Sequence, residues 1–392
     1  MFHHTMKGLA GTCGLAAIAS GLASIILLSV LPLTAFGQGE SAVPFLLISP
    51  NSRASGMGES GVALADDAAS IFWNPAGLAF QMDEGTEISI THANWLPQFG
   101  QSDLFYEYLN FRYPVPYWGG TFGASVTYLN FGEFIQTGPT GPEEIGRFKS
   151  FDFAITAGYG ARVSNSLGLG VNLRFIHSNL SPIGAGQEEG SGRASTISFD
   201  IATLWRPTHL RIPLLGLQLD DRFGFGVNLS NLGPKVTYID AAQADPLPTN
   251  FRLGLAFDVL QSDFNNITYT LDFSRLLIRK HRADTTGGAV EEPKPPDPFY
   301  KAIFTAWGDG GLRKANVSTG LEYWYGRPRL IALRMGYFWE DPQFGNRKFL
   351  SFGAGIRYSM YGFDFSYIST FEENHPLSDT LRFTLLIGWG GA

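Results

Sequence analysis

The sequence predicts an all-β protein, a fourteen-stranded antiparallel transmembrane β-barrel that follows a compact N-terminal segment. Aromatic residues make up 14% of the chain and glycine occurs 47 times, whereas only 16% of the residues are charged. Apolar residues alternate with small or polar ones from about residue 87 to the C-terminus, as in strands with one face on lipid and one on a polar lumen. Long connections alternate with short ones, which is typical of outer-membrane barrels.

The chain begins with a predicted secretory signal peptide, residues 1–37. Lys7 precedes an apolar run over residues 9–33, and small residues lead to a cleavage site near Gly37. The run is long for a signal, so a transmembrane anchor is the alternative. Cys13 is the only cysteine and lies in this segment, so the mature chain would have no disulfide or thiol chemistry.

Residues 38–85 are predicted to form a compact coil with one short helix. Closely spaced glycines suit tight turns, an acidic pair favours a helix start, and an Asn-Pro pair ends the helix. Such a segment has no face large enough for its own core, so it must pack inside another structure. Its key residues are Gly56, Gly58, Gly61, Asp66, Asp67, Trp73, Asn74 and Pro75.

The strands are predicted from the period-two pattern, which is clearest over residues 167–175, where five apolar residues share one face. A soluble sandwich has the same period, so alternation alone does not decide between the two folds. The Gly-x-Gly pairs in these strands thin the wall or let another segment approach it. The strands are predicted at residues 87–95, 103–113, 121–131, 148–162, 167–179, 194–205, 222–231, 250–258, 266–274, 316–325, 330–339, 348–359, 362–369 and 380–389.

The connections predict the orientation in the membrane. The short ones include residues 163–166, 326–329 and 360–361, and the longest spans 275–315. Short turns face the periplasm in such barrels and long loops face outside, so both termini are expected in the periplasm. The connection 206–221 is long on the short-turn side, and the sequence offers no account of it beyond an extended turn.

The longest connection, residues 275–315, has two interpretations. Its middle is rich in proline and acidic residues, which favours an extended chain, and its second half could form a short apolar helix. The helix is either rim packing or a docking surface, since exposed apolar patches often mark partner sites. The candidate partner-binding residues are Phe299, Tyr300, Ile303, Phe304 and Trp307.

No catalytic, metal-binding or cofactor-binding site is predicted. The seven histidines show no metal-ligand spacing, and a net charge of −7 without a basic patch makes nucleic acid an unexpected partner. Charged residues at inward strand positions are expected to pair with one another and with the N-terminal segment, because inward charges need partners. These are Asp152, Asp200, Asp272, Asp364, Arg174, Arg252 and Arg357.

Ordered motifs resemble a known family. Ser55-Gly-Met-Gly58, Ala65-Asp-Asp-Ala68 and Asn74-Pro-Ala76 are similar to the N-terminal hatch of FadL-type outer-membrane barrels, which plugs the lumen. Residues 44–53 and Phe72-Trp73 look more specifically like the PorV/PorQ family of type IX secretion. The C-terminus departs from the family by running past its last strand. Similar strand signatures lie at residues 228–234, 321–325, 333–338, 351–358, 363–367 and 376–383.

The resemblance implies a hatch over residues 38–85, a barrel over 86–392, and a place in the outer-membrane lipid. It further implies that the protein receives cargo from the secretion translocon, through the cargo's C-terminal signal domain, and passes it to the surface attachment machinery. A FadL-like channel for hydrophobic solutes and a structural subunit without cargo are the alternatives. An apolar lumen with a lateral opening would favour the channel, and a sealed polar lumen with apolar loop tips would favour secretion.

Overall fold

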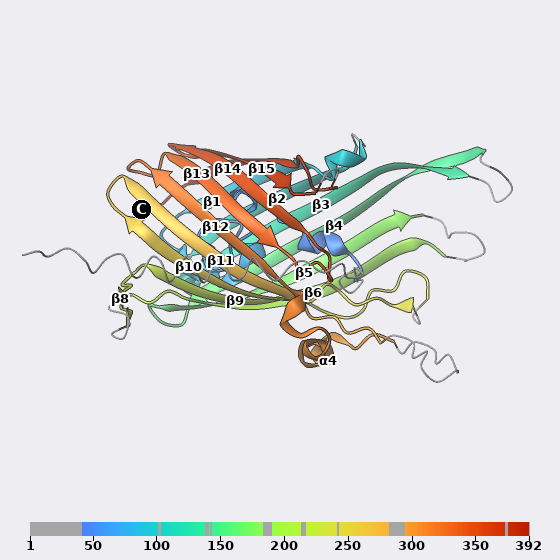
Figure 1. Cartoon of the computed structure of the whole chain (residues 1–392), viewed down its shortest axis with the longest axis horizontal. Helices are drawn as coiled ribbons and strands as arrows, with labels where there is room; N and C mark the ends of the chain where they lie inside the picture. Colours follow the sequence, from blue (N-terminus) through green and yellow to red (C-terminus); the bar gives the residue numbers. More distant parts are fainter. Residues whose placement is uncertain are drawn as a thin grey trace, which may run out of the picture.

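The computed structural model describes residues 41–100, 103–137, 141, 143–182, 190–212, 217–240, 243–281, 295–372 and 375–391. Within these residues, fourteen antiparallel strands close into a barrel in which β1 pairs with both β2 and β16 (Figure 1). The predicted all-β fold and strand number are confirmed. No helix in this part of the chain is both long and apolar enough to cross a membrane.

The barrel strands follow one another in sequence order, apart from β7 and β8, which form a separate ribbon. They are β1 (Thr86–Asn94), β2 (Phe105–Val115), β3 (Gly120–Thr137), β4 (Glu144–Arg162), β5 (Leu167–Ser181), β6 (Gly192–Trp205), β9 (Phe223–Leu232), β10 (Asn250–Gln261), β11 (Asn265–Leu276), β12 (Ala315–Tyr325), β13 (Ile331–Trp339), β14 (Lys348–Tyr358), β15 (Tyr361–Thr370) and β16 (Leu381–Trp389).

β3 and β4 are longer than the sequence predicts and extend beyond their neighbours as a hairpin (Figure 1). The residues expected to connect them, 132–147, largely continue the two strands. The register shifts between Asn130 and Gly132, and Gly132 has a φ of 93°. Such a bulge reverses which residues face inward, so the alternation that predicts the strand breaks there although the pairing continues.

The two faces of the wall follow the predicted alternation. On β5, the Val171 side chain is 53% exposed, whereas Asn172 is 3% exposed and faces the lumen. Exposed aromatic residues gather at the end of the barrel that carries the short turns, as in the girdles of membrane barrels. They include Tyr113, Tyr117, Trp118, Trp205, Tyr325, Tyr358, Tyr361 and Trp389.

The long connection 206–221, which the sequence left without an account, folds as a small ribbon at the short-turn end. Its strands are β7 (Arg211–Ile212) and β8 (Leu217–Gln218), which pair antiparallel. The amide of Leu219 donates to the Leu210 carbonyl, which continues the ribbon toward the barrel.

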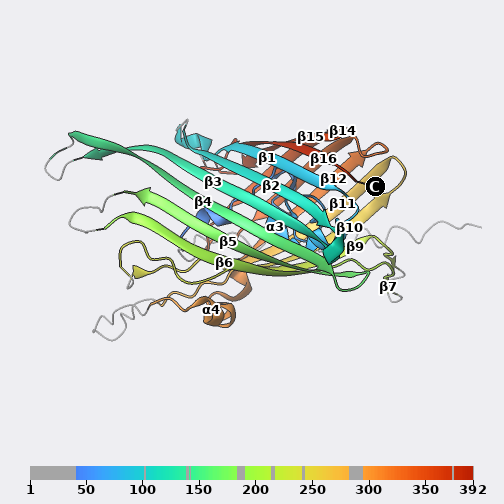
Figure 2. The same ribbon diagram turned by 180° about the vertical axis from the view of Figure 1, so that it is seen from behind.

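The N-terminal segment, here residues 41–85, contains short helices inside the barrel (Figure 2). They are η1 (Pro44–Leu47), α2 (Ser52–Ser55), α3 (Ser70–Trp73) and η2 (Pro75–Phe80). α3 ends at Asn74, as its Asn-Pro pair predicts. Two further one-turn elements, η3 (Pro97–Phe99) and η4 (Pro116–Trp118), lie between barrel strands.

The two ends of the described chain lie at opposite ends of the barrel. Strand β16 ends at Trp389 on the short-turn side. The amide of Ala42 donates to the carbonyl of Pro246, in the connection between β9 and β10 at the long-connection end. The expected signal peptide, residues 1–37, and the expected start of the mature chain both lie outside the described residues.

Candidate functional site

The contact between the N-terminal segment and the inner wall is the candidate functional site. From Phe45 to Ala79 most side chains of the segment are buried, although the segment has little regular structure. It reaches this burial by packing against inward-facing residues of nearly the whole barrel. η2 packs on β3 to β6, and α2 packs on β14 to β16.

Glycines on both sides allow the segment and the wall to come into backbone contact. Gly58 has a φ of 68°, and a Cβ there would lie 2.7 Å from the Thr319 carbonyl oxygen and the Tyr337 amide nitrogen. On the wall, a Cβ at Gly336 would overlap the backbone of Met57 and Gly58. A Cβ at Gly170 would likewise overlap Pro75 and Ala76. The strand glycines therefore provide room for the segment.

Two further glycines singled out from the sequence also lie at close contacts. Gly56 packs on Gly353 of β14, where a Cβ would lie 3.0 Å from the Gly353 Cα. Gly61 lies under the ring of Trp73, and a Cβ there would be 2.9 Å from the indole. The indole nitrogen of Trp73 donates to the Asn51 side chain at 3.0 Å, which fixes the ring over this turn.

Arg53 connects the N-terminal segment to the wall through a buried ionic chain. Its guanidinium donates twice to Glu322 of β12, with both distances 2.7 Å, and also binds Asp66 within the segment. Glu322 accepts a second arginine, Arg334 of β13, at 2.8 Å, and Arg334 in turn binds Asp364 of β15 at 2.8 Å. Buried charges are costly unless paired, so removing one member would leave its neighbours unpaired.

Asp66 and Asp67 lie next to each other but ionise differently. Burial raises the pKa of Asp67 to about 6, helped by the nearby carboxylates of Glu87 and Asp66 and opposed by Arg53. Burial acts on Asp66 in the same direction, but the charges of Arg53 and Arg329 outweigh it and lower its pKa. Asp67 is therefore the carboxyl group of this pair that titrates closer to neutral pH.

Polar side chains of the wall bind the backbone of the segment at other points. Asp272 of β11 accepts from the amides of Gly61 at 2.7 Å and Val62 at 2.9 Å. Asn172 of β5 donates to the Ile71 carbonyl at 2.7 Å, and Asn228 of β9 donates to the Trp73 carbonyl at 2.9 Å. These bonds satisfy backbone groups that the irregular segment cannot pair internally.

Asn74, at the predicted end of the helix before Pro75, also binds the barrel wall. The Asn74 side chain donates to the Thr203 carbonyl of β6 at 3.0 Å and to the Val62 carbonyl at 3.0 Å. Its side-chain oxygen accepts from the Ala76 amide at 3.0 Å and so caps η2, which begins at Pro75. One side chain thus joins two turns of the segment to the barrel.

The inward charges singled out from the sequence form pairs of the expected kind. Arg174 binds Asp200 at 2.8 Å, and Arg357 binds Asp364 at 2.6 Å. Arg252 instead stacks over the rings of Phe72 and Trp73, at 4.7 and 5.3 Å from the ring centroids. Asp152 is buried and has no ion pair with another described residue.

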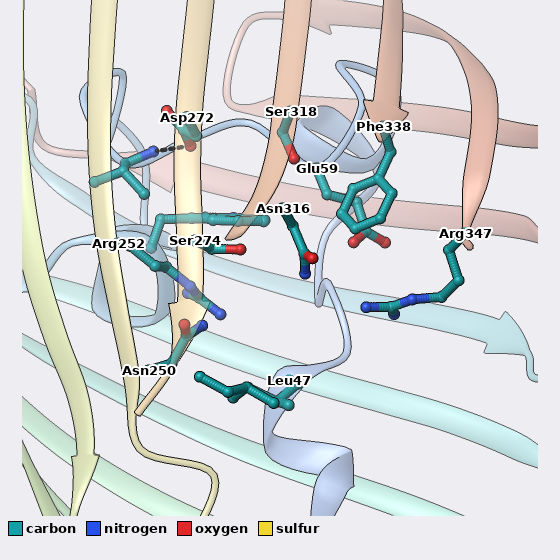
Figure 3. A pocket seen from close by; sticks show the side chains of 13 residues that line it. Leu47, Glu59, Asn250, Arg252, Asp272, Ser274, Asn316, Ser318, Phe338 and Arg347 are labelled. Atoms are coloured by element: carbon teal, nitrogen blue, oxygen red, sulfur yellow. Dashed lines mark hydrogen bonds between the residues drawn. The ribbon is translucent and has the colours of Figure 1, made fainter. Parts of the chain in front are cut away.

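A small cavity lies between the segment and β10 to β13 (Figure 3). Its volume is about 80 Å³, room for a few water molecules. Glu59 and Arg252 extend toward it from the segment and from β10, and Asn250, Ser274 and Asn316 line it as well. The cavity is therefore too small to hold a large apolar molecule.

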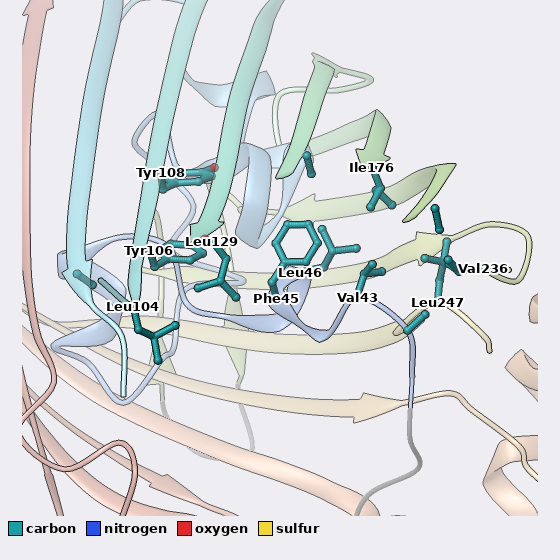
Figure 4. Close-up of a cluster of buried hydrophobic side chains, with 14 residues drawn as sticks. Val43, Phe45, Leu46, Leu104, Tyr106, Tyr108, Leu129, Ile176, Val236 and Leu247 are labelled. Atoms are coloured by element: carbon teal, nitrogen blue, oxygen red, sulfur yellow. The ribbon is translucent and has the colours of Figure 1, made fainter. Parts of the chain in front are cut away.

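A buried apolar cluster fills the lumen toward the long-connection end (Figure 4). Phe45 and Leu46 of η1 pack there with Tyr106 and Tyr108 of β2. Leu247, from the connection between β9 and β10, closes the cluster from the side. Burial of this apolar cluster away from water stabilises the position of the first described residues.

The predicted partner-binding residues lie on α4 (Phe299–Thr305) and η7 (Ala306–Gly308), outside the barrel wall next to β6 (Figures 1 and 2). Phe299 packs edge-on against Phe199 of β6 at 6.0 Å, and Trp307 packs against Phe251 of β10 at 5.8 Å. Tyr300 and Phe304 are 65% and 77% exposed. The helix therefore has one face on the barrel and one face free.

The structure also describes both ends of the longest connection, residues 275–315. Asp297 accepts hydrogen bonds from Lys301 and Thr305, both at 2.8 Å, and so holds the first turn of α4. Burial raises the pKa of Asp297, but these bonds and one from His281 outweigh it and lower the pKa. Ile303 is half-buried, and η8 (Gly311–Lys314) leads into β12. The proline-rich middle, residues 282–294, lies outside the described residues.

Sequence reasoning did not single out Arg53, Glu322 or Arg334 as site residues. Glu322 and Arg334 are directly opposite each other in the β12–β13 register, at inward positions of both strands. The alternating pattern of β12 and β13 could have predicted that Glu322 and Arg334 face the lumen. Only the closed barrel brings Arg53 next to them. Among the described residues, no group of three or more His, Cys, Asp or Glu side chains could hold a metal ion.

A closed barrel with an apolar outer face and a segment packed in its polar lumen defines an integral outer-membrane barrel protein. The family model "Type IX secretion system protein PorV" matches residues 38–282, and the chain belongs to this family. The protein is thus an outer-membrane component of type IX secretion. No individual curated protein is similar enough to the chain to count as a match.

The solved structures that match the chain have low sequence identity to it. The Ralstonia pickettii toluene transporter TbuX is 13% identical with a TM-score of 0.48, over 92% of this chain and 100% of that one. The Pseudomonas putida toluene transporter TodX is 11% identical with a TM-score of 0.48, over 91% and 97%. A Pseudomonas aeruginosa FadL homologue is 12% identical with a TM-score of 0.43, over 87% and 98%.

Proposed function

We propose that this protein receives cargo from the type IX translocon, by the cargo's C-terminal signal domain, and passes it to the surface attachment machinery. In this proposal it is a plugged scaffold and not an enzyme or a pore. Residues 1–37 direct export, residues 38–85 are the hatch, and residues 86–392 form the barrel. In this proposal the long connections face outside and the C-terminus faces the periplasm, whereas Ala42, close to the start of the mature chain, lies at the outer end.

The observation that carries the proposal is the filled lumen. Arg53, Asp272 and Asn74 attach the segment to different parts of the wall, and the cavity between the segment and β10 to β13 measures about 80 Å³. Apolar side chains are exposed instead at the long-connection end, as on α4 and on the β3–β4 hairpin, where Phe134 and Ile135 are exposed. A filled lumen with apolar side chains exposed at the long-connection end favours recognition of a protein over passage of a hydrophobic solute.

Site-specific photo-crosslinking in cells tests this proposal. A photoreactive residue at Phe304, on the free face of α4, is expected to give adducts with cargo signal domains or translocon proteins. The matched control is Tyr117, which is 93% exposed at the opposite end of the barrel. Protein adducts at Phe304 but not at Tyr117 support the proposal. No protein adduct at either site, with uptake of a hydrophobic solute into vesicles, would favour the channel.

A further inference from the structure

The part of the β3–β4 hairpin that projects beyond the barrel consists of two strands that pair only with each other (Figures 1 and 2). The last residue of β3 that pairs with β2 is Asn130, and the first residue of β4 that pairs with β5 is Phe151. Beyond these points, β3 and β4 continue to pair as far as Thr137 and Glu144. Within the part of the chain that the structure describes, the outer edges of this hairpin therefore have no strand partner.

Two hydrogen bonds at the base of the hairpin show which way its backbone groups point. On the β2 side, the Glu133 amide donates to the Asp103 carboxylate at 3.1 Å. On the β5 side, the Lys149 carbonyl accepts from the Asn179 side chain at 3.1 Å. Glu133 and Lys149 are directly opposite each other, so theirs is a pair whose backbone groups point outward. Because such pairs alternate along an antiparallel ladder, the amide and carbonyl of Ile135 also point to the open edge of β3.

The β3 edge is less protected against pairing than the β4 edge. Charged side chains and proline usually keep an exposed strand edge from pairing with another chain. Residues 134–137 of β3 are Phe-Ile-Gln-Thr, with neither charge nor proline. The β4 edge carries Glu144, Arg147 and Lys149 over the corresponding stretch. The edge of β3 is therefore the one that is open to an added strand.

A third strand would stabilise this part of the molecule. A two-stranded hairpin in water is marginally stable at best, whereas three strands with a buried apolar face are stable. Phe134 and Phe148 stack on one face of the hairpin, with ring centroids 5.8 Å apart. On the other face, Ile135 and Ile145 are 56% and 60% exposed. Apolar side chains thus lie beside the open edge on both faces, where cross-strand neighbours would cover them.

We propose that an extended segment of a partner protein adds as a further strand to the outer edge of β3. Its backbone pairs with the outward amide and carbonyl of Ile135, and its apolar side chains lie beside Phe134 and Ile135. Main-chain hydrogen bonds supply affinity in this mode of recognition, and alternate side chains supply specificity. The inference rests on the proposed function for the outward orientation of the hairpin, and it adds how the partner is held.

Mapped photo-crosslinks test this pairing in cells that carry the full-length protein. A photoreactive phenylalanine analogue is placed at Glu133 or at Ile135, whose side chains share one face, and the crosslinked partner residues are identified by mass spectrometry. The two positions are expected to react with partner residues two apart in one segment, because side chains on one face of paired strands alternate. Absence of protein adducts, adducts at scattered partner residues, or adducts with a second copy of this chain would each overturn the proposal.

Proline variants separate backbone pairing from side-chain contact, with the analogue now at Thr137. Ile135→Pro removes the outward amide of β3, and an edge strand tolerates proline where its N–H faces outward. The adduct yield is expected to fall roughly fivefold, the effect of one lost hydrogen bond. Ile135→Val alters the side chain but keeps the amide, so its yield should stay nearly unchanged.

The matched control is Arg147→Pro, at the residue directly opposite Ile135 in the same hairpin. It removes an outward amide from the β4 edge, so the adduct yield should stay unchanged although the hairpin is perturbed to a similar extent. Equal loss in Arg147→Pro, or no loss in Ile135→Pro, would show that no strand adds to β3. Protein adducts at Phe304 without any at the β3 edge would overturn this inference and leave the proposed function standing.

Discussion

Asp67 makes the attachment of the N-terminal segment depend on pH. Its folded-state pKa of about 6 lies above the ordinary value of 3.8, so its contribution to stability is complete below about pH 4 and is lost as the pH rises through 6. We expect hydrogen-exchange protection of residues 52–79 to decrease between pH 4 and 7, and Asp67→Asn to reduce this dependence. Identical pH profiles in the two proteins would contradict the prediction.

Val171 tests the outward face of the wall. Arginine at a lipid-facing position near the bilayer midplane costs roughly 2–4 kcal/mol, and near the interface about 0–1 kcal/mol. Val171→Arg is therefore expected to destabilise the barrel strongly in urea unfolding from lipid vesicles. Val163→Arg, in the turn after β4, is the matched control and should have little effect, since Val163 is 64% exposed at the end of the barrel. Equal effects would show that the assigned membrane depth is wrong.

Alternation alone would select Asn172, the inward neighbour of Val171, as a control position where arginine has only a mild effect. The contacts of Asn172 rule out this use. It donates to both the Ile71 carbonyl and Asp200, and it is 3% exposed. An arginine there would displace the N-terminal segment. The lumen side of this wall is a packed interior and not a water-filled channel.

At the scale of the elements, α4 and η7 have one face that packs on the barrel and one face that is exposed and available for recognition. Phe304 is exposed, whereas Trp307 packs on Phe251 and lies 5.0 Å from the Arg275 guanidinium. We expect Phe304→Ser to reduce delivery of cargo to the surface while the thermal unfolding temperature stays nearly unchanged. Trp307→Ser should lower that temperature, because it removes contacts with the barrel wall. Normal secretion in Phe304→Ser would place cargo recognition elsewhere, for example on the β3–β4 hairpin.

At the scale of the whole molecule, the barrel and the N-terminal segment are stabilised by different contacts. Each barrel strand pairs with two neighbouring strands, so the ladder closes without the segment. Deletion of residues 52–79 is therefore expected to leave a barrel that inserts but conducts small solutes in planar bilayers. Gly58→Val should act in the same direction, because a Cβ there meets backbone atoms of β12 and β13 and the left-handed φ is unfavourable for valine. A silent barrel after the deletion would show that the segment is not the plug.

The sequence determined the barrel, because period-two alternation and turn spacing are local properties that one strand and its neighbours reveal. It placed all fourteen strands and the inward charges, and it missed the β3–β4 extension because the bulge at Gly132 breaks the alternation. The motifs of residues 52–78 predicted a compact segment, but its partners came only from the tertiary structure. Arg53 and Glu322 are separated by 269 positions, and only closure of the barrel brings their charges together.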